Sequence, residues 1–247
     1  EKRPCSGAEP VAGKVDSVGE LISRLAQVRA ACPQDARADA RFLAYMPSLR
    51  IAGARPHPSP LVESVAMAAI KSPELAYRPY FPADIITGGR LSIAQLEVVC
   101  AAGQEHERFM LGAGGRRVRC GYMIGDGTGV GKGREAAGVI CDNWHKGLRR
   151  HVWVTADDNK LLAAAQRDLR ALGLSPNLAF SLRDVRLGEP IKRTEGVLVV
   201  SHGQLRSVKG DASRLQQILA WVGDDEFDGE GLSLSLRCYQ HLVGGRS

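Results

Sequence analysis

The segment IGDGTGVGKGR, residues 124–134, brings together the residue types that hold phosphate groups. Its five glycines allow the backbone to turn so that successive N–H groups face one centre. The positive end of a following helix adds to the attraction for an anion. Lys132 directly follows Gly131, which is the spacing at which a P-loop lysine reaches the β- and γ-phosphates of a nucleotide. The segment therefore predicts a nucleotide phosphate site.

The segment departs from the pattern G-x-x-x-x-G-K-[ST] at two positions. Asp126 stands at the first glycine, although Gly125 and Gly127 flank it. Gly133 stands where a Ser or Thr hydroxyl normally contacts Mg²⁺, so the metal needs another ligand or a water and is expected to bind weakly or indirectly. The same residues partly fit the pattern G-x-G-x-x-G of dinucleotide-binding proteins. Lys132 argues against this alternative, because it favours a P-loop that holds phosphate.

The neighbouring segments supply the order strand, loop, helix that a P-loop requires. Residues 118–126 are predicted to form a short apolar strand, and residues 133–147 a helix closed by Gly147. Further along come a strand over 150–156, a helix over 158–173, a loop with one short strand over 175–196, a strand within 196–207 and a helix over 213–223. Strands that alternate with helices at this spacing predict βαβ units, and therefore an α/β fold with a parallel sheet.

The N-terminal part of the chain predicts less regular structure. Residues 1–19 are rich in Gly, Pro and Lys and are expected to be disordered, whereas residues 18–32 show helical spacing. Five prolines between positions 33 and 60 break any long element. Helices are predicted over 60–73 and, with Ser92 as N-cap, over 91–110. The expected domains are a helical and irregular extension over 1–60, a lobe over 61–229 and a divergent tail over 230–247.

The composition argues against several classes of protein. The chain has 247 residues and a net charge of +6, which is compatible with nucleic-acid binding without requiring it. None of the six cysteines forms a CxxC pair or has a zinc-ligand spacing with His, so a reduced chain without structural zinc is expected. No segment approaches the roughly 20 apolar residues of a membrane helix, so no membrane partner is expected. The sequence contains neither an HExxH nor a G-x-S-x-G motif, so it gives no indication of a zinc protease or a serine hydrolase.

Several separated blocks resemble the strawberry notch family in order and spacing, and more narrowly the bacterial proteins that carry its P-loop NTP hydrolase domain. The blocks, within residues 60–229, are LVESVAMAAI, LSIAQLEVV, GYMIGDGTGVGKGREAAGVICDNW, VWVTADDNKLLAAAQRDLRALG, EGVLVVSHGQLRS and SRLQQILAWVGDDEFDG. GVGKGR is itself the family's form of the loop, so the resemblance makes Gly133 a family trait. The family is similar to superfamily 2 helicases, which implies a partial RecA-like P-loop NTPase lobe that binds ATP and Mg²⁺.

The resemblance implies roles residue by residue. Lys132 and the amides of residues 129–133 would hold phosphate, and Gln95 matches a glutamine placed like the adenine-reading residue of related helicases. Thr155, Ser201 and His202 lie where helicase lobes contact nucleic acid or relay the nucleotide state, or else they cap strand ends. No catalytic or metal-ligating residue is assigned. The predicted nucleotide-binding residues are Asp126, Gly127, Thr128, Gly129, Val130, Gly131, Lys132, Gly133, Arg134 and Gln95.

The resemblance stops after the block FDG, residues 227–229. In the family an apolar strand and a DExH-type box follow, which hold Mg²⁺ and activate water, whereas here EGLSLSLRCYQHLVGGRS follows. Residues 224–226, DDE, come after a helix and are expected to form an acidic surface turn. The sequence thus predicts ATP binding without efficient hydrolysis, in a truncated, frame-shifted or fragmentary chain.

The complete family member is expected to couple ATP hydrolysis to work on DNA or chromatin-like complexes. A bacterial relative implies the cytoplasm, and a eukaryotic relative implies transcription regulation in the nucleus. Two alternatives stay open: a remnant whose incomplete sheet is unstable alone, and a non-enzymatic module that docks nucleic acid or a protein. The docking surface of that module would consist of Arg116, Arg117, Arg119, Arg149 and Arg150. The oligomeric state is left undetermined.

Overall fold

The structure is a computed structural model that describes residues 42–112, 115, 117–156, 158–183 and 185–223. The described chain packs into two compact units, a smaller one made of residues 42–46 and 60–73 and a larger one made of residues 47–59 and 74–223. The predicted helix over 18–32, the segment expected to be disordered, and the acidic turn at 224–226 lie outside the described residues.

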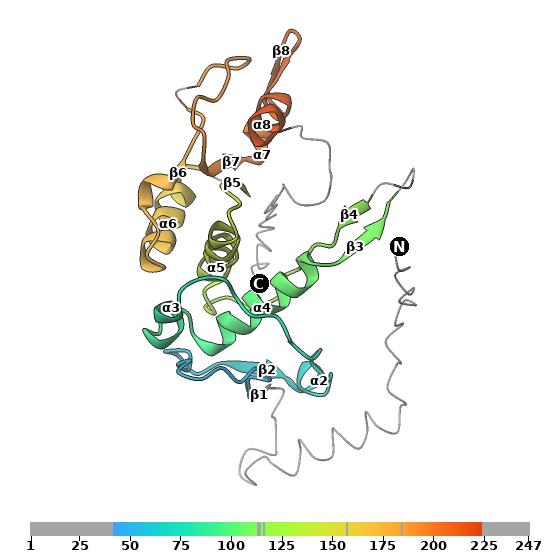
Figure 1. The fold of residues 1–247 in the computed structure, drawn as a ribbon, viewed down its shortest axis with the longest axis vertical. Helices are drawn as coiled ribbons and strands as arrows, with labels where there is room; N and C mark the ends of the chain where they lie inside the picture. Colours follow the sequence, from blue (N-terminus) through green and yellow to red (C-terminus); the bar gives the residue numbers. More distant parts are fainter. Residues whose placement is uncertain (1–41, 113–114, 116, 157, 184, 224–247) are drawn as a thin grey trace, which may run out of the picture. The chain divides into compact units, whose positions relative to one another are not determined.

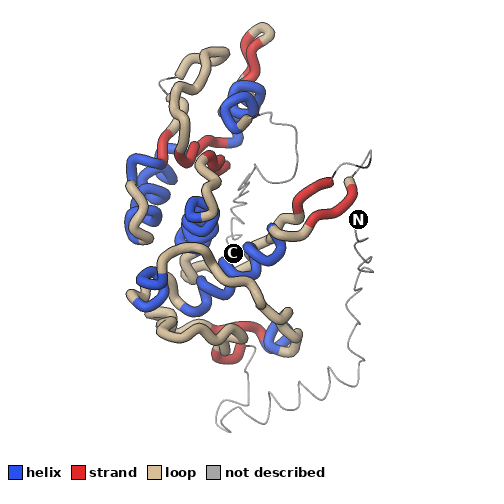
Figure 2. Tube along the Cα trace, viewed as in Figure 1, coloured by secondary structure: helices blue, strands red, loops and turns tan. Residues whose placement is uncertain are grey.

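The smaller unit is a strand pair followed by one helical turn (Figure 2). β1 (Phe42–Ala44) pairs antiparallel with β2 (Val62–Ser64), and α2 (Val65–Ala68) begins directly after it. The prediction of one helix over 60–73 is therefore wrong for most of its length. The ladder with β1 binds the backbone of residues 62–64, and the Ser64 hydroxyl accepts the Met67 N–H at 3.2 Å, so the helix cannot begin before Ser64.

A three-stranded parallel sheet forms the centre of the larger unit (Figure 1). β5 (Arg150–Thr155), β7 (Gly196–Ser201) and β6 (Ala179–Phe180) lie in the order β5-β7-β6. The register pairs Arg150 with Gly196 and Thr155 with Ser201, so the strands end together at one edge. Both long strands read as nearly continuous apolar runs, which is typical of parallel strands covered on both faces. The predicted α/β fold is confirmed.

Helices cover both faces of this sheet. Successive residues of a strand face opposite sides. Val197 and Val199 pack in one apolar core with α4 (Ile93–His106), α5 (Lys132–His145) and α6 (Asp158–Ala171). Leu198 and Val200 pack in a second core with Trp221 of α8 (Arg214–Val222). Shorter helices lie at α3 (Ala83–Thr87), α7 (His202–Leu205) and the 3-10 turn η3 (Pro176–Leu178).

The helix boundaries follow the local signals in the sequence. Ser92 caps α4 through a capping box, and Gly147, Gly173 and Gly223 follow α5, α6 and α8 with φ of +94°, +84° and +108°. A helix that ends on a residue with positive φ favours glycine, because no side chain then opposes the turn. The predicted helices over 91–110, 133–147, 158–173 and 213–223 are confirmed, with α4 ending at His106.

The segment before the glycine-rich loop does not form the predicted strand over 118–126. β3 (Phe109–Leu111) and β4 (Arg117–Arg119) form an antiparallel hairpin, and residues 120–126 have no regular structure. The backbone of β4 forms its hydrogen bonds with β3, the strand that precedes it in the sequence. Tyr122 and Met123 lie outside the parallel sheet and are 39% and 88% exposed. A second small hairpin pairs β8 (Val208–Lys209) with β9 (Ala212–Ser213).

Cys100, Cys120 and Cys141 are buried and form no disulfide. Within the described ranges no group of three or more His, Cys, Asp or Glu side chains is arranged to hold a metal ion. The described helices also include none that is both long and apolar enough to span a bilayer.

Candidate nucleotide-binding site

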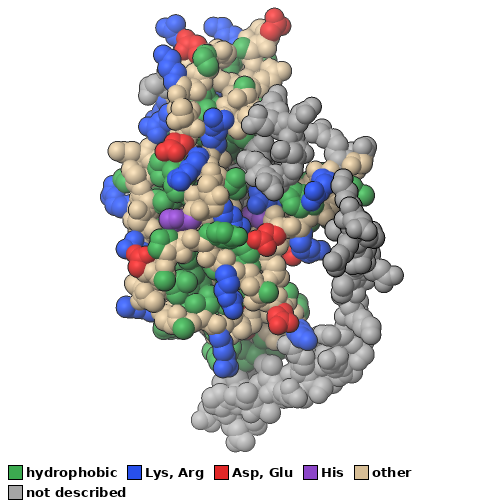
Figure 3. Space-filling model, in the orientation of Figure 1, with side chains coloured by type: hydrophobic (Ala, Val, Ile, Leu, Met, Phe, Trp, Pro, Cys, Tyr) green, Lys and Arg blue, Asp and Glu red, His purple; other side chains and the backbone are tan. Residues whose placement is uncertain are grey.

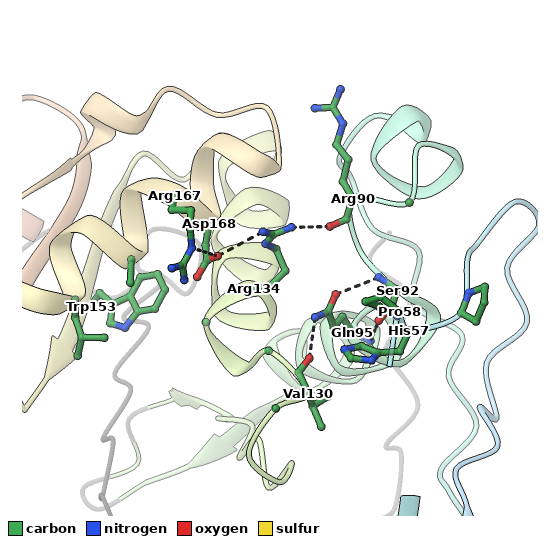
Figure 4. A pocket seen from close by; sticks show the side chains of 17 residues that line it. His57, Pro58, Arg90, Ser92, Gln95, Val130, Arg134, Trp153, Arg167 and Asp168 are labelled. Atoms are coloured by element: carbon green, nitrogen blue, oxygen red, sulfur yellow. Dashed lines mark hydrogen bonds and ion pairs between the residues drawn. The ribbon is translucent and has the colours of Figure 1, made fainter. Parts of the chain in front are cut away.

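A cavity of about 490 Å³ lies beside the glycine-rich loop, within the larger unit (Figure 4). The loop, the start of α4, the start of α5, one side of α6 and the strap Pro56–Pro58 line it. Of the ten predicted nucleotide-binding residues, the lining includes Gln95, Gly129, Val130, Gly131, Gly133 and Arg134. Its charged side chains are three arginines and one aspartate, Arg90, Arg134, Arg167 and Asp168. This excess of positive charge suits a polyanion.

The loop turns into α5 through two glycines that no other residue would easily replace. Gly129 and Gly131 have φ of +97° and +93°, and Gly131 is the N-cap of α5. A Cβ on Gly131 would also lie 2.6 Å from the Gln95 Nε2 atom. By contrast, a Cβ on Gly125, Gly127 or Gly129 would meet no atom within 4 Å, so the loop is open on that side. An open backbone turn at the start of a 14-residue helix is the geometry that receives phosphate oxygens.

Lys132 folds back over this turn. Its ammonium group donates to the carbonyl oxygens of Asp126 at 2.9 Å and Gly127 at 2.8 Å. The cationic head thus lies over the loop, while Asp126 is half-buried and Thr128 is exposed. An ammonium group has three donors and can exchange carbonyl partners for phosphate oxygens without moving its backbone.

Gln95 ties the start of α4 to the loop. Its Oε1 atom accepts the Ser92 N–H at 3.1 Å, and its Nε2 atom donates to the Val130 carbonyl at 2.9 Å. The side chain is 8% exposed, so both ends of the amide are used inside the protein. The structure therefore brings Gln95 to the loop and holds it there through hydrogen bonds within the protein, and its adenine-reading role stays a prediction.

Arg134 points from α5 toward α6 and the turn before α4 (Figure 4). It donates to the Arg90 carbonyl at 3.1 Å and pairs with the Asp168 carboxylate at 3.5 Å, and Arg167 pairs with the same carboxylate at 3.5 Å. Asp168 also lies against the loop, because its Oδ2 atom is 2.6 Å from the position that a Cβ on Gly133 would take. Sequence reasoning missed Asp168. Its signal was an acidic residue on the buried stripe of α6, three residues after Ala165 and four before Leu172.

Besides His151 at its Nδ1 atom, two residues of β5 carry buried polar atoms that have no hydrogen-bond partner among the described residues. These are the indole nitrogen of Trp153, which lines the cavity, and the hydroxyl of Thr155, at the end of β5. Thr155 lies opposite Ser201, whose hydroxyl accepts the Gln204 N–H at 3.2 Å and caps α7. Ser201 therefore has the capping role that was one of its two predicted alternatives, while Thr155 and Ser201 do not line the cavity.

The arginines of the predicted docking surface are engaged within the fold. Arg149 and Arg117 stack on Trp144 and Phe109, with guanidinium-to-ring distances of 4.6 and 4.5 Å. Arg150 and Arg119 donate to backbone carbonyls, at 2.9 Å for Thr194 and 2.7 Å for His106, and Arg116 lies outside the described residues. Lys and Arg side chains are scattered across the face seen in Figure 3 and do not gather into one patch.

Buried titratable groups away from the cavity have structural surroundings. Burial lowers the pKa of His151 to about 4, and its Nε2 atom lies 3.0 Å from the Leu148 carbonyl. Tyr77 donates its hydroxyl hydrogen to Asp142, and burial raises the pKa of both groups. Asp142 also accepts the Tyr80 N–H at 2.6 Å, so this cluster anchors the segment before α3 on α5.

Comparison with known proteins identifies the relatives of this region. Residues 56–232 match the family described as P-loop containing NTP hydrolase pore-1. The chain is 36% identical over 197 residues to Protein strawberry notch homolog 1 of Gallus gallus, which covers 76% of this chain and 15% of the relative. It is 34% identical over 197 residues to the Homo sapiens protein of that name and to Protein FORGETTER 1 of Arabidopsis thaliana, each covering 76% of this chain and 14% of the relative. The chain therefore spans about 15% of the length of these relatives. No solved structure matches it significantly.

Proposed function

This chain belongs to the P-loop containing NTP hydrolase pore-1 family in its strawberry notch-like form, and from that premise we propose that its cavity binds ATP. The observation that carries the proposal is the turn at residues 129–133. Two glycines with positive φ place an open backbone at the start of α5, and the Lys132 ammonium group lies over the neighbouring carbonyls of Asp126 and Gly127. Arg90, Arg134 and Arg167 add positive charge to the adjoining cavity, which is partly balanced by Asp168 and by Asp84, the partner of Arg90 at 3.0 Å.

Each part of the cavity has a role in this proposal. The amides of residues 129–133 hold phosphate oxygens, and Lys132 exchanges the carbonyls of Asp126 and Gly127 for them. The base lies toward the strap Pro56–Pro58, which also lines the cavity, while Gln95 holds the loop in place. Bound Mg²⁺ neutralises charge on the phosphates. Gly133 offers that metal no side-chain oxygen.

We propose further that this region binds ATP without efficient hydrolysis. No pair of acidic side chains faces the loop among the described residues that line the cavity, since Asp168 is the one carboxylate there. In the whole protein, the lobe would support work on DNA or transcription regulation, in the nucleus of a eukaryote or the cytoplasm of a bacterium. The basis of that part of the proposal is the resemblance of the sequence blocks within residues 60–229 to a family similar to superfamily 2 helicases.

The test is calorimetric titration of Mg-ATP into the chain and into Lys132→Ala. We expect saturable binding by the parent and at least about a tenfold loss in the variant, because a charge-assisted contact to phosphate contributes roughly 1.5–3 kcal/mol. Lys192→Ala is the matched control, since Lys192 is exposed and does not line the cavity. A folded parent that binds no ATP refutes the proposal, and equal binding by Lys132→Ala places the nucleotide elsewhere.

A further inference from the structure

We propose that Asp168 takes the place of the hydroxyl that the loop lacks, and that its carboxylate is the protein ligand to the Mg²⁺ of the bound nucleotide. The inference rests on the proposed ATP binding. It assigns a metal-binding role to a residue on α6, which lies 35 positions beyond Gly133 in the sequence.

The geometry at Gly133 carries the inference. In a P-loop the residue after the lysine places a Ser or Thr oxygen one bond beyond its Cβ. Here the Oδ2 atom of Asp168 lies 2.6 Å from the Cβ position of residue 133. A carboxylate oxygen from a different helix therefore lies in the space directly beside the Cβ position, which a Ser or Thr side chain would need. A side chain on residue 133 would collide with the Asp168 carboxylate where it now lies, so the two cannot be present together.

The chemistry of Mg²⁺ fits a single carboxylate. This ion keeps several waters and binds through one or two carboxylates together with substrate phosphates, without a dedicated cage of protein ligands. The described residues contain no cage of three or more acidic or sulfur and nitrogen ligands, which agrees with a metal that arrives with the nucleotide. Asp168 is the one carboxylate in the described lining of the cavity.

The surroundings of Asp168 leave the relevant oxygen turned toward the loop. Both ion pairs, to Arg134 and Arg167, reach Oδ1 at 3.5 Å, the long end of the range for such pairs. Oδ2 is the atom that faces Gly133. The two guanidinium groups hold the side chain in place, and the side chain itself is only 8% exposed, so little rotamer freedom remains to be lost when a metal binds.

A second observation in the same cavity points to a bound polar ligand. Trp153 is 4% exposed, lines the cavity, and its indole N–H has no hydrogen-bond partner among the described residues. Burying an N–H without an acceptor costs free energy, and about 1–3 kcal/mol is typical of mutational data. A polar ligand atom that reached this nitrogen would supply the acceptor.

The test measures how much Mg²⁺ strengthens ATP binding, by calorimetry with Mg²⁺ and with EDTA. We expect Asp168→Asn to lose about tenfold or more of the Mg²⁺-dependent gain in affinity, because loss of even a supporting residue at a metal site typically costs 10–100-fold in metal affinity. Binding in EDTA should not weaken, since the variant leaves the positive charges of Arg134 and Arg167 unpaired in the cavity. Mn²⁺ with ATP, followed by electron paramagnetic resonance, gives a second readout that does not depend on turnover. Asp211→Asn is the matched control, since Asp211 is exposed and does not line the cavity.

The double variant Gly133→Ser/Asp168→Ala keeps the proposal testable if Asp168→Asn folds poorly. It returns a hydroxyl to the volume that the carboxylate has left, and we expect it to regain most of the Mg²⁺-dependent gain that Asp168→Ala loses. A Mg²⁺-dependent gain that persists in Asp168→Asn, or a double variant no better than Asp168→Ala, overturns this inference and leaves ATP binding intact. A folded parent that binds ATP in neither condition overturns both proposals.

Discussion

Replacing Gly133 with alanine tests the packing at the heart of the site. Gly133 lies in the first turn of α5 with an ordinary helical backbone, where alanine would normally stabilise a helix by up to roughly 0.5–1 kcal/mol. In this protein the new methyl group would lie 2.6 Å from the Asp168 Oδ2 atom, well inside van der Waals contact. The carboxylate is only 8% exposed and is held by Arg134, so its displacement costs roughly 1–3 kcal/mol. We expect Gly133→Ala to lower the free energy of unfolding by about 1 kcal/mol as the net of these two effects.

The decisive measurement is the same substitution in the Asp168→Ala background. With the carboxylate removed, the methyl group no longer meets an oxygen, and Gly133→Ala is expected to stabilise the protein by about 0.5 kcal/mol. Urea unfolding of the parent, both single variants and the double variant gives the four free energies and hence the coupling energy between the two positions. The reasoning is refuted if Gly133→Ala stabilises the parent, or if its effect is the same in both backgrounds.

Two further predictions concern the core. A Cβ on Gly103 of α4 would overlap a ring carbon of Tyr77, so Gly103→Ala is expected to destabilise the protein by about 2 kcal/mol. A urea midpoint at or above that of the parent would contradict this packing. Burial lowers the pKa of His151 from 6.5 to about 4, so between these values the unfolded chain binds more protons than the folded one. The contribution of neutral His151 to the free energy of unfolding is therefore complete above pH 6.5. It decreases by about 3 kcal/mol as the pH falls to 4. Urea unfolding against pH should show this loss in the parent and a clearly smaller one in His151→Gln; equal slopes would contradict it.

The sequence by itself determined the elements whose signals are local. Ser92 with Gln95 starts α4, Gly147 and Gly173 follow the ends of α5 and α6, and the alternation of apolar strands with amphipathic helices specifies a parallel sheet. The loop at residues 125–134 was evident for the same reason, because its glycines and Lys132 adjoin in the chain. Signals of this kind depend on residues that are within one or two helical turns in the sequence. They can therefore be recognised without knowledge of the tertiary packing.

The tertiary structure alone decided which distant residues complete the site. Residues 118–126 have apolar character suited to a strand, yet β4 pairs with β3 and the remainder stays outside the sheet, because pairing depends on which ladder is available. The approach of Asp168 to Gly133 depends on the packing of α6 against α5, and the bond from Gln95 to the Val130 carbonyl depends on where α4 begins relative to the loop. Neither contact has a sequence spacing that would reveal it, since each is set by how whole helices pack through their buried faces.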